Sequence, residues 1–152
     1  MKRQVFGAIA MLSVVAAASV SAVMMAQEKP AGRTLKVKLS YTGSGTVDEK
    51  HLIQVFVFDT PNFTSGQEVP IMIQSSSTKE ATLTFSDVDK SPLYLTAAYD
   101  PQGGYNEVLG PPPSGSSLGL HANGEGVPEP IKIEPGSTVE IALAFDDSNK
   151  MP

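Results

Sequence analysis

The chain contains no cysteine among its 152 residues, and this absence excludes several functions. A disulfide framework, a thiolate nucleophile and a cysteine-based metal site all require cysteine. A lipoprotein anchor is excluded as well, because no cysteine follows the apolar N-terminal segment described below. We therefore expect a domain that is held together by burial of its hydrophobic core alone.

Recognisable catalytic motifs are also lacking. The two histidines, His51 and His121, stand in no known motif, and the chain has no HExxH zinc motif, P-loop or dinucleotide-binding glycine motif. Residues 113–117, Pro-Ser-Gly-Ser-Ser, are typical of a flexible turn and not of a nucleophile elbow. We predict that the protein is not an enzyme. The alternative is a hydrolase whose site is not visible in sequence, with a nucleophile within reach of one histidine.

Positive charge is scarce in the chain. Lysine and arginine number 11 against 16 acidic residues, which gives a formal net charge of −5. Loss of Lys2 and Arg3 with the N-terminal segment makes the remaining chain more negative still. This charge disfavours nucleic acid and anionic membranes as partners and permits cations or basic partners. A simpler interpretation is that the charge only keeps the protein soluble.

The N-terminal segment 1–26 has the pattern of a signal peptide. Two basic residues precede an uncharged apolar stretch at 5–26, and small residues at 20–22 and 24–26 offer cleavage sites. We predict export, to the periplasm or outside the cell, with no membrane attachment after cleavage. The alternative is an uncleaved anchor, because the apolar stretch is just long enough to span a bilayer. After it we expect a linker at 27–33, one domain at 34–147 and a polar tail at 148–152.

The rest of the chain predicts an all-β domain. At 34–41 apolar residues alternate with polar ones, whereas 55–58 is apolar on both faces and predicts a central strand covered on both sides. Turn-forming residues separate the strands and no helical period is found after residue 26. We predict a single seven-stranded Greek-key β-sandwich, immunoglobulin- or transthyretin-like. Its predicted strands are 34–41, 52–58, 69–74, 80–85, 93–99, 131–133 and 138–145.

A long loop at 101–130, rich in glycine and proline, interrupts this pattern. Loops of this length are usually functional or disordered, and within it 107–109 and 117–121 are predicted to pair as a small ribbon. We predict that the protein binds a partner at this end, either an envelope protein or a carbohydrate. The candidate partner-binding residues are Tyr105, Phe63 and His121. Exposed loop aromatics can bind partners. The alternative is that the rings of Phe63 and Tyr105 fold back over the end of the sandwich.

Carboxylates gather at the strand ends. Three predicted strands end in an aromatic residue followed by aspartate, and alternating strand directions bring two of these ends together with the start of strand 52–58. Clustered carboxylates suit calcium, which takes six to eight oxygen ligands. The sequence thus gives a possible Ca²⁺ site as an alternative function, although aspartate at strand ends also caps turns. The candidate ligands are Asp100, Asp146, Asp147, Asp48 and Glu49.

The C-terminal pattern resembles that of transthyretin-like and carboxypeptidase-regulatory-like β-sandwich domains of exported bacterial proteins. The resemblance is carried by a short strand, a Pro-Gly turn and a long alternating strand, Ile131-Lys132-Ile133-Glu134-Pro135-Gly136-Ser137-Thr138-Val139-Glu140-Ile141. Enzymes of the transthyretin-like group hydrolyse 5-hydroxyisourate with histidine and arginine residues and a C-terminal Tyr-Arg-Gly-Ser. This chain ends in Asn149-Lys150-Met151-Pro152, and Arg33 is its only arginine after the leader. The resemblance therefore implies the fold and argues against that activity.

Overall fold

The computed structural model describes residues 31–65, 67–105 and 110–152. The predicted signal segment 1–26, part of the linker and the predicted strand 107–109 lie outside these ranges. Within the described part of the chain, no helix is long and apolar enough to cross a membrane.

The described residues form seven strands and one short 3-10 helix. The helix, η1, spans Pro61–Ser65 between β2 and β3. The strands are β1 (Arg33–Tyr41), β2 (Ile53–Phe58), β3 (Met72–Ser76), β4 (Glu80–Val88), β5 (Tyr94–Tyr99), β6 (Ser117–Leu120) and β7 (Thr138–Phe145).

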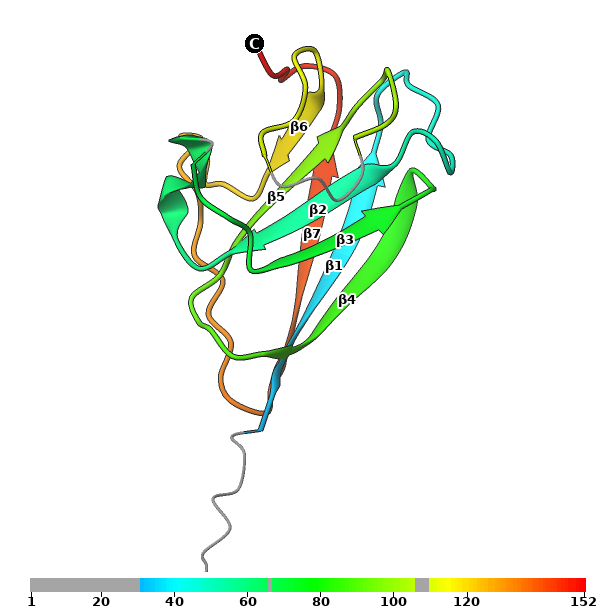
Figure 1. Ribbon diagram of the computed structural model, residues 1–152. Coiled ribbons are helices and arrows are strands. Elements are labelled where there is room, and N and C mark those ends of the chain that lie inside the picture. Colours follow the sequence, from blue (N-terminus) through cyan, green and yellow to red (C-terminus); the bar gives the residue numbers. More distant parts are fainter. Residues whose placement is uncertain (1–30, 66, 106–109) are drawn as a thin grey trace, which may run out of the picture.

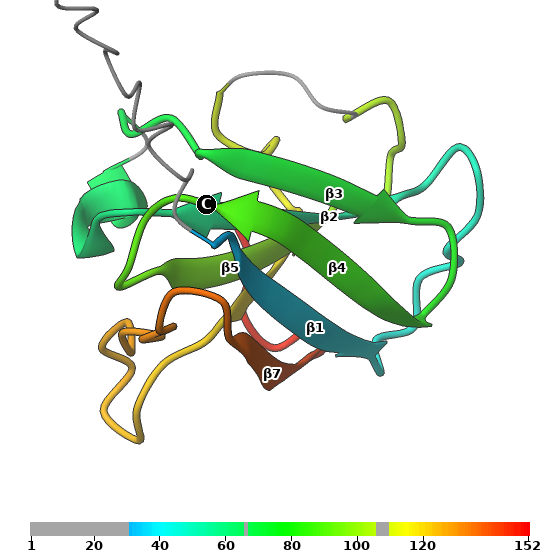
Figure 2. The same ribbon diagram turned by 90° about the horizontal axis from the view of Figure 1, so that it is seen from below.

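The strands form two sheets (Figure 1). A three-stranded sheet has the order β4-β1-β7, and a four-stranded sheet has the order β3-β2-β5-β6. β1 pairs antiparallel with β4 and parallel with β7, so the first and last strands run side by side. Figure 2 shows the two sheets as separate layers, with β3 and β2 on one side and β1 and β7 on the other.

The main core lies between the two sheets. In β1, Leu35, Val37, Leu39 and Tyr41 are buried while the lysines between them are exposed, as the alternation predicts. These side chains join the inward residues of β2, β5 and β7 in one cluster. Burial of such side chains contributes about 1.5–3 kcal/mol each, so this layer holds the fold together.

A second apolar cluster covers the opposite face of the four-stranded sheet. All six residues of β2 are buried, which confirms the prediction of a central strand covered on both sides. Phe56 and Phe58 point away from the main core and pack with Phe63, Ala98 and Tyr105. The chain segments that cover this face create the site described below.

Three predicted elements differ in the structure. β3 begins at Met72 instead of residue 69, because Pro70 has no backbone N–H to donate to a neighbouring strand. Residues 131–133 form only one isolated bridge, between Ile131 and Leu93, because prolines at 130 and 135 leave too short a segment for a strand. The seventh strand is instead β6, which pairs with β5.

Candidate functional site

The acidic residues predicted as calcium ligands gather largely at one end of the fold. β1 and β7 both finish there, beside the end of β5 and the start of β2. The Tyr99 hydroxyl donates to the carbonyl of Thr46, two residues before Asp48, at 2.8 Å, and its ring lies 4.8 Å from that of Tyr41, whose hydroxyl bonds to Asp147. Burial raises the pKa of Tyr99, and the charges of Asp147, Asp48 and Asp100 raise it further. The structure therefore places these three carboxylates at the same end.

Asp147 is held by four other residues. Its carboxylate accepts hydrogen bonds from the hydroxyls of Ser117 and Tyr41 at 2.6 Å and from the Ser44 amide at 2.8 Å, while Lys150 Nζ lies 3.2 Å away. The Ser117 bond and then the Tyr41 bond are the main causes that hold the pKa of Asp147 well below its usual range. Burial, helped by the bond to Asp147, raises the pKa of Tyr41 to about 12. This cluster ties β1, β6 and the tail together.

Asp48, Asp100 and Asp146 accept hydrogen bonds from nearby amides, which for Asp48 are those of Lys50 and His51. Asp48 pairs with the imidazole Nδ1 of His51 at 2.8 Å, and this bond is the main cause that lowers its pKa. Asp146 accepts the Ser148 amide at 2.8 Å, and Asp100 accepts the Gln102 amide at 2.9 Å. Glu49 is exposed.

This geometry is that of turn capping. Within residues 31–65, 67–105 and 110–152, no three histidine or acidic side chains form a group that could hold a metal. Calcium binding stays an alternative that a thermal melt with and without calcium can test.

The aromatic residues predicted to bind a partner fold back onto the sheet. Phe63 in η1 is 9% exposed and stacks on Phe58 with ring centroids 4.7 Å apart. Tyr105 is 8% exposed and donates its hydroxyl to the Gly110 carbonyl at 2.9 Å. Both rings therefore build the outer-face cluster and present little surface to solvent.

His121, the third predicted partner-binding residue, lies just beyond β6. Its amide bonds to the Leu95 carbonyl, and its Nε2 is 4.0 Å from a carboxylate oxygen of Glu129. Its side chain is 20% exposed. His121 thus joins the strand end to the following turn and lies outside the groove described next.

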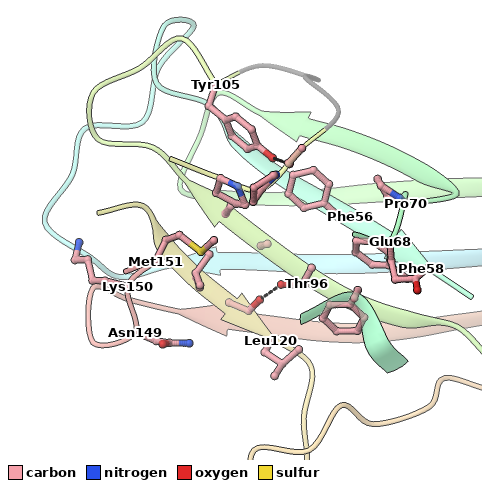
Figure 3. A pocket seen from close by; sticks show the side chains of 18 of the residues that line it. Phe56, Phe58, Glu68, Pro70, Thr96, Tyr105, Leu120, Asn149, Lys150 and Met151 are labelled. Atoms are coloured by element: carbon pink, nitrogen blue, oxygen red, sulfur yellow. Dashed lines mark hydrogen bonds between the residues drawn. The ribbon is translucent and has the colours of Figure 1, made fainter. Parts of the chain in front are cut away.

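An apolar groove of about 630 Å³ lies on the outer face of the four-stranded sheet (Figure 3). Its floor is made by outward side chains of β2, β5 and β6, among them Phe56, Thr96 and Leu120. Residues 67–70 and 110–112 form parts of its walls, and the C-terminal residues 149–152 complete them. Within the predicted functional loop 101–130, residues 110–112 thus form part of a wall, and β6 forms part of the floor.

The polar atoms that Thr96 and Tyr105 bring to the groove bond inside the protein, whereas the buried Oε1 of Gln54 on β2 has no hydrogen-bond partner among the described residues. Thr96 donates its hydroxyl to the Gly119 carbonyl at 2.6 Å. The Tyr105 hydroxyl donates to the Gly110 carbonyl. The backbone carbonyl of Tyr105 accepts a hydrogen bond from the side-chain amide of Gln54 at 2.6 Å. The floor therefore offers mainly apolar surface to a ligand.

The C-terminal tail is positioned by pairing with the free edge of β6. The Leu118 amide donates to the Asn149 carbonyl and the Met151 amide to the Ser116 carbonyl, both at 2.8 Å. Figure 1 shows this end of the chain beside β6. Sequence reasoning treated 148–152 as a polar tail and missed this role, because no local pattern marks a segment that pairs across the fold.

Comparison of the chain with protein-family models, with curated proteins and with solved structures gives no match.

Proposed function

We propose that the protein is an exported, non-catalytic binding module whose binding site is the outer-face groove. One observation carries this proposal: a mostly apolar groove of about 630 Å³ in which the hydroxyls of Thr96 and Tyr105 are internally bonded. Pockets for small molecules usually have about 300–1,000 Å³ and a mostly apolar lining. The ligand is expected to present an apolar surface. A carbohydrate fits less well, because its hydroxyls need hydrogen-bond partners.

The surroundings of the candidate nucleophiles support a non-catalytic role. Ser117 lies 3.0 Å from Lys150 Nζ, but it is fully buried and its hydroxyl donates to Asp147. Among the described residues, His51 pairs with Asp48, and His121 faces an acidic side chain. Within the described ranges, neither histidine has the hydroxyl partner that a nucleophile–base pair requires.

The finer fold class and the location belong to the same proposal. β5 returns to lie beside β2 after β3 and β4, and the Gln74 side chain of β3 bonds to a β4 carbonyl at 2.6 Å. This order supports a Greek-key arrangement of the transthyretin-like kind. Export rests on the pattern of segment 1–26.

The test is the binding of a neutral apolar probe, N-phenyl-1-naphthylamine, to the purified protein. We expect its fluorescence to rise on binding and to fall back when Leu120 on the groove floor becomes aspartate, because a charge there has no partner. Val127→Asp is the matched control, since Val127 is 53% exposed and lies outside the groove.

Leu120→Trp is a second variant that fills the groove without adding charge. Melting curves of all variants are measured to check that they fold. The proposal is wrong if the folded Leu120 variants bind the probe as the wild type does.

A further inference from the structure

We propose that Asn123 is a modification site, at which the folded hairpin around it promotes loss of the side-chain amide and formation of aspartate and isoaspartate. The reaction is independent of the groove and goes beyond the proposed function. Three features support it. They are the Asn-Gly sequence at an exposed tip, the free amide of Gly124, and two N–H groups that hold the side-chain carbonyl oxygen of Asn123.

The hairpin 121–129 presents Asn123 at its tip. The Asn123 amide donates to the Val127 carbonyl at 3.0 Å, and the Asn123 carbonyl accepts the Gly126 amide at 2.9 Å. Figure 2 shows this segment as the gold and orange loop at the lower left, outside the two sheets. Residues 123–127 are all exposed. The backbone of Asn123 is therefore fixed in a turn that water reaches freely.

The groups that react at this tip are free. In the part of the chain that the structure describes, neither the Gly124 amide nor the side-chain nitrogen of Asn123 has a hydrogen-bond partner. A Cβ atom built on Gly124 would meet no atom within 4 Å, so the space around this residue is open. Because glycine has no side chain beside its nitrogen, that nitrogen can approach the side-chain carbonyl carbon of Asn123 without hindrance.

Two backbone donors hold the side-chain carbonyl oxygen. Asn123 Oδ1 accepts the Glu125 amide at 3.0 Å and the Val127 amide at 3.1 Å. The first bond closes an Asx turn, which folds the side chain back over Gly124. Attack on the carbonyl carbon places negative charge on Oδ1, and preorganised N–H donors stabilise such a developing charge. The hairpin therefore supplies donors at the atom where the charge forms.

The reaction needs water as its only co-reactant. Hydroxide removes the proton from the Gly124 amide, and the nitrogen forms a bond to Cγ of Asn123. The bond between Cγ and Nδ2 then breaks, and Nδ2 takes a proton and leaves as ammonia. Water hydrolyses the resulting succinimide at either carbonyl, which gives aspartate or isoaspartate. Both products add a carboxylate next to the exposed Glu125, so the modified hairpin carries more negative charge.

The test is peptide mapping by mass spectrometry after incubation of the purified protein in mildly alkaline buffer. Asn123 should be modified before Asn62 and Asn149, because neither of these precedes a glycine. In the folded protein Asn123 should also react about two- to tenfold faster than in a synthetic peptide of residues 119–129, the range that one net hydrogen bond supports.

Two variants separate the roles of the tip. Gly124→Ala adds a methyl group beside the attacking nitrogen and should slow the reaction. Glu125→Pro removes one of the two donors and should also slow it, whereas Glu125→Gln, the matched control, keeps the amide and should react as the wild type does. A rate in the folded protein equal to or below that in the peptide would show that the hairpin protects Asn123 and would overturn the inference. An unchanged rate in Glu125→Pro would overturn it as well.

Discussion

Asp147 accepts hydrogen bonds from residues that lie far from it along the chain. Tyr41 and Ser44 are 106 and 103 positions away, and Ser117 is 30 positions away. The sequence displays an aspartate at a strand end, where both a metal ligand and a turn cap are plausible. Its actual donors become neighbours only when β1 and β6 reach the same end of the fold. For this reason the position of the carboxylate was predictable and its partners were not.

Replacement of Asp147 by asparagine should lower the free energy of unfolding by about 1–3 kcal/mol at pH 7, because hydrogen bonds to a charged group are lost. The native pKa of Asp147 lies below the unfolded value of about 3.9, so the stabilisation is complete above that pH and is lost as the pH falls below it. Urea denaturation from pH 7 to pH 2.5 should show that the difference in free energy of unfolding between wild type and Asp147→Asn becomes smaller below about pH 4.

Asp146→Asn serves as the neighbouring control for this experiment. Asp146 is exposed and accepts the amide of Ser148 two positions away. Its loss should cost less stability than the loss of Asp147. A gap for Asp147→Asn that stays constant down to pH 2.5 would show that the ionised carboxylate is not the stabilising species.

At the scale of elements, β6 depends on a residue without a side chain. Gly119 faces the main core, and a Cβ atom built there would lie 2.8 Å from Cγ of the Phe145 ring. Its neighbours Leu118 and Leu120 face the outer cluster instead. The close approach lets β6 pack over β7 while its leucines form the groove floor.

Gly119→Ala should therefore destabilise the protein by about 1–3 kcal/mol, because the buried Phe145 ring has little space to move. Gly124→Ala is the matched control, since a Cβ there meets no atom within 4 Å. It should change stability by less than about 0.5 kcal/mol. Chemical denaturation of both variants checks this, and equal effects would contradict the packing argument.

The strands that the alternation of apolar and polar residues predicts correctly are those that pair along most of their length. β1, β4 and β7 form one sheet through long registers, so their patterns survive in the structure. Short segments behave differently, because pairing across the fold decides their state. Residues 131–133 reach only one bridge, whereas 117–120 becomes a strand through its contact with β5.

At the scale of the whole molecule, the sequence indicated that strand β2 is covered on both faces but not which segments cover it. Phe56 and Phe58 face away from the main core, so their burial requires a second layer of chain over this face of the sheet. That layer is assembled from η1, part of the long loop and the C-terminal tail, which are separated along the chain. Because such segments carry no shared local pattern, the groove itself was not predictable.

Calcium binding is decided at the same scale, because an ion that binds only the folded protein raises the melting temperature of the entire domain. A ligand at one hundred times its dissociation constant adds about 2.7 kcal/mol, which shifts the midpoint by several degrees. We expect no such shift between chelator and millimolar calcium, because Asp48, Asp100, Asp146 and Asp147 already accept hydrogen bonds from protein donors. A thermal melt of the purified protein measures this directly. A rise that disappears in Asp146→Ala would instead identify the acidic end as a cation site, and the turn-capping bonds would then have to rearrange to free the oxygen ligands that calcium requires.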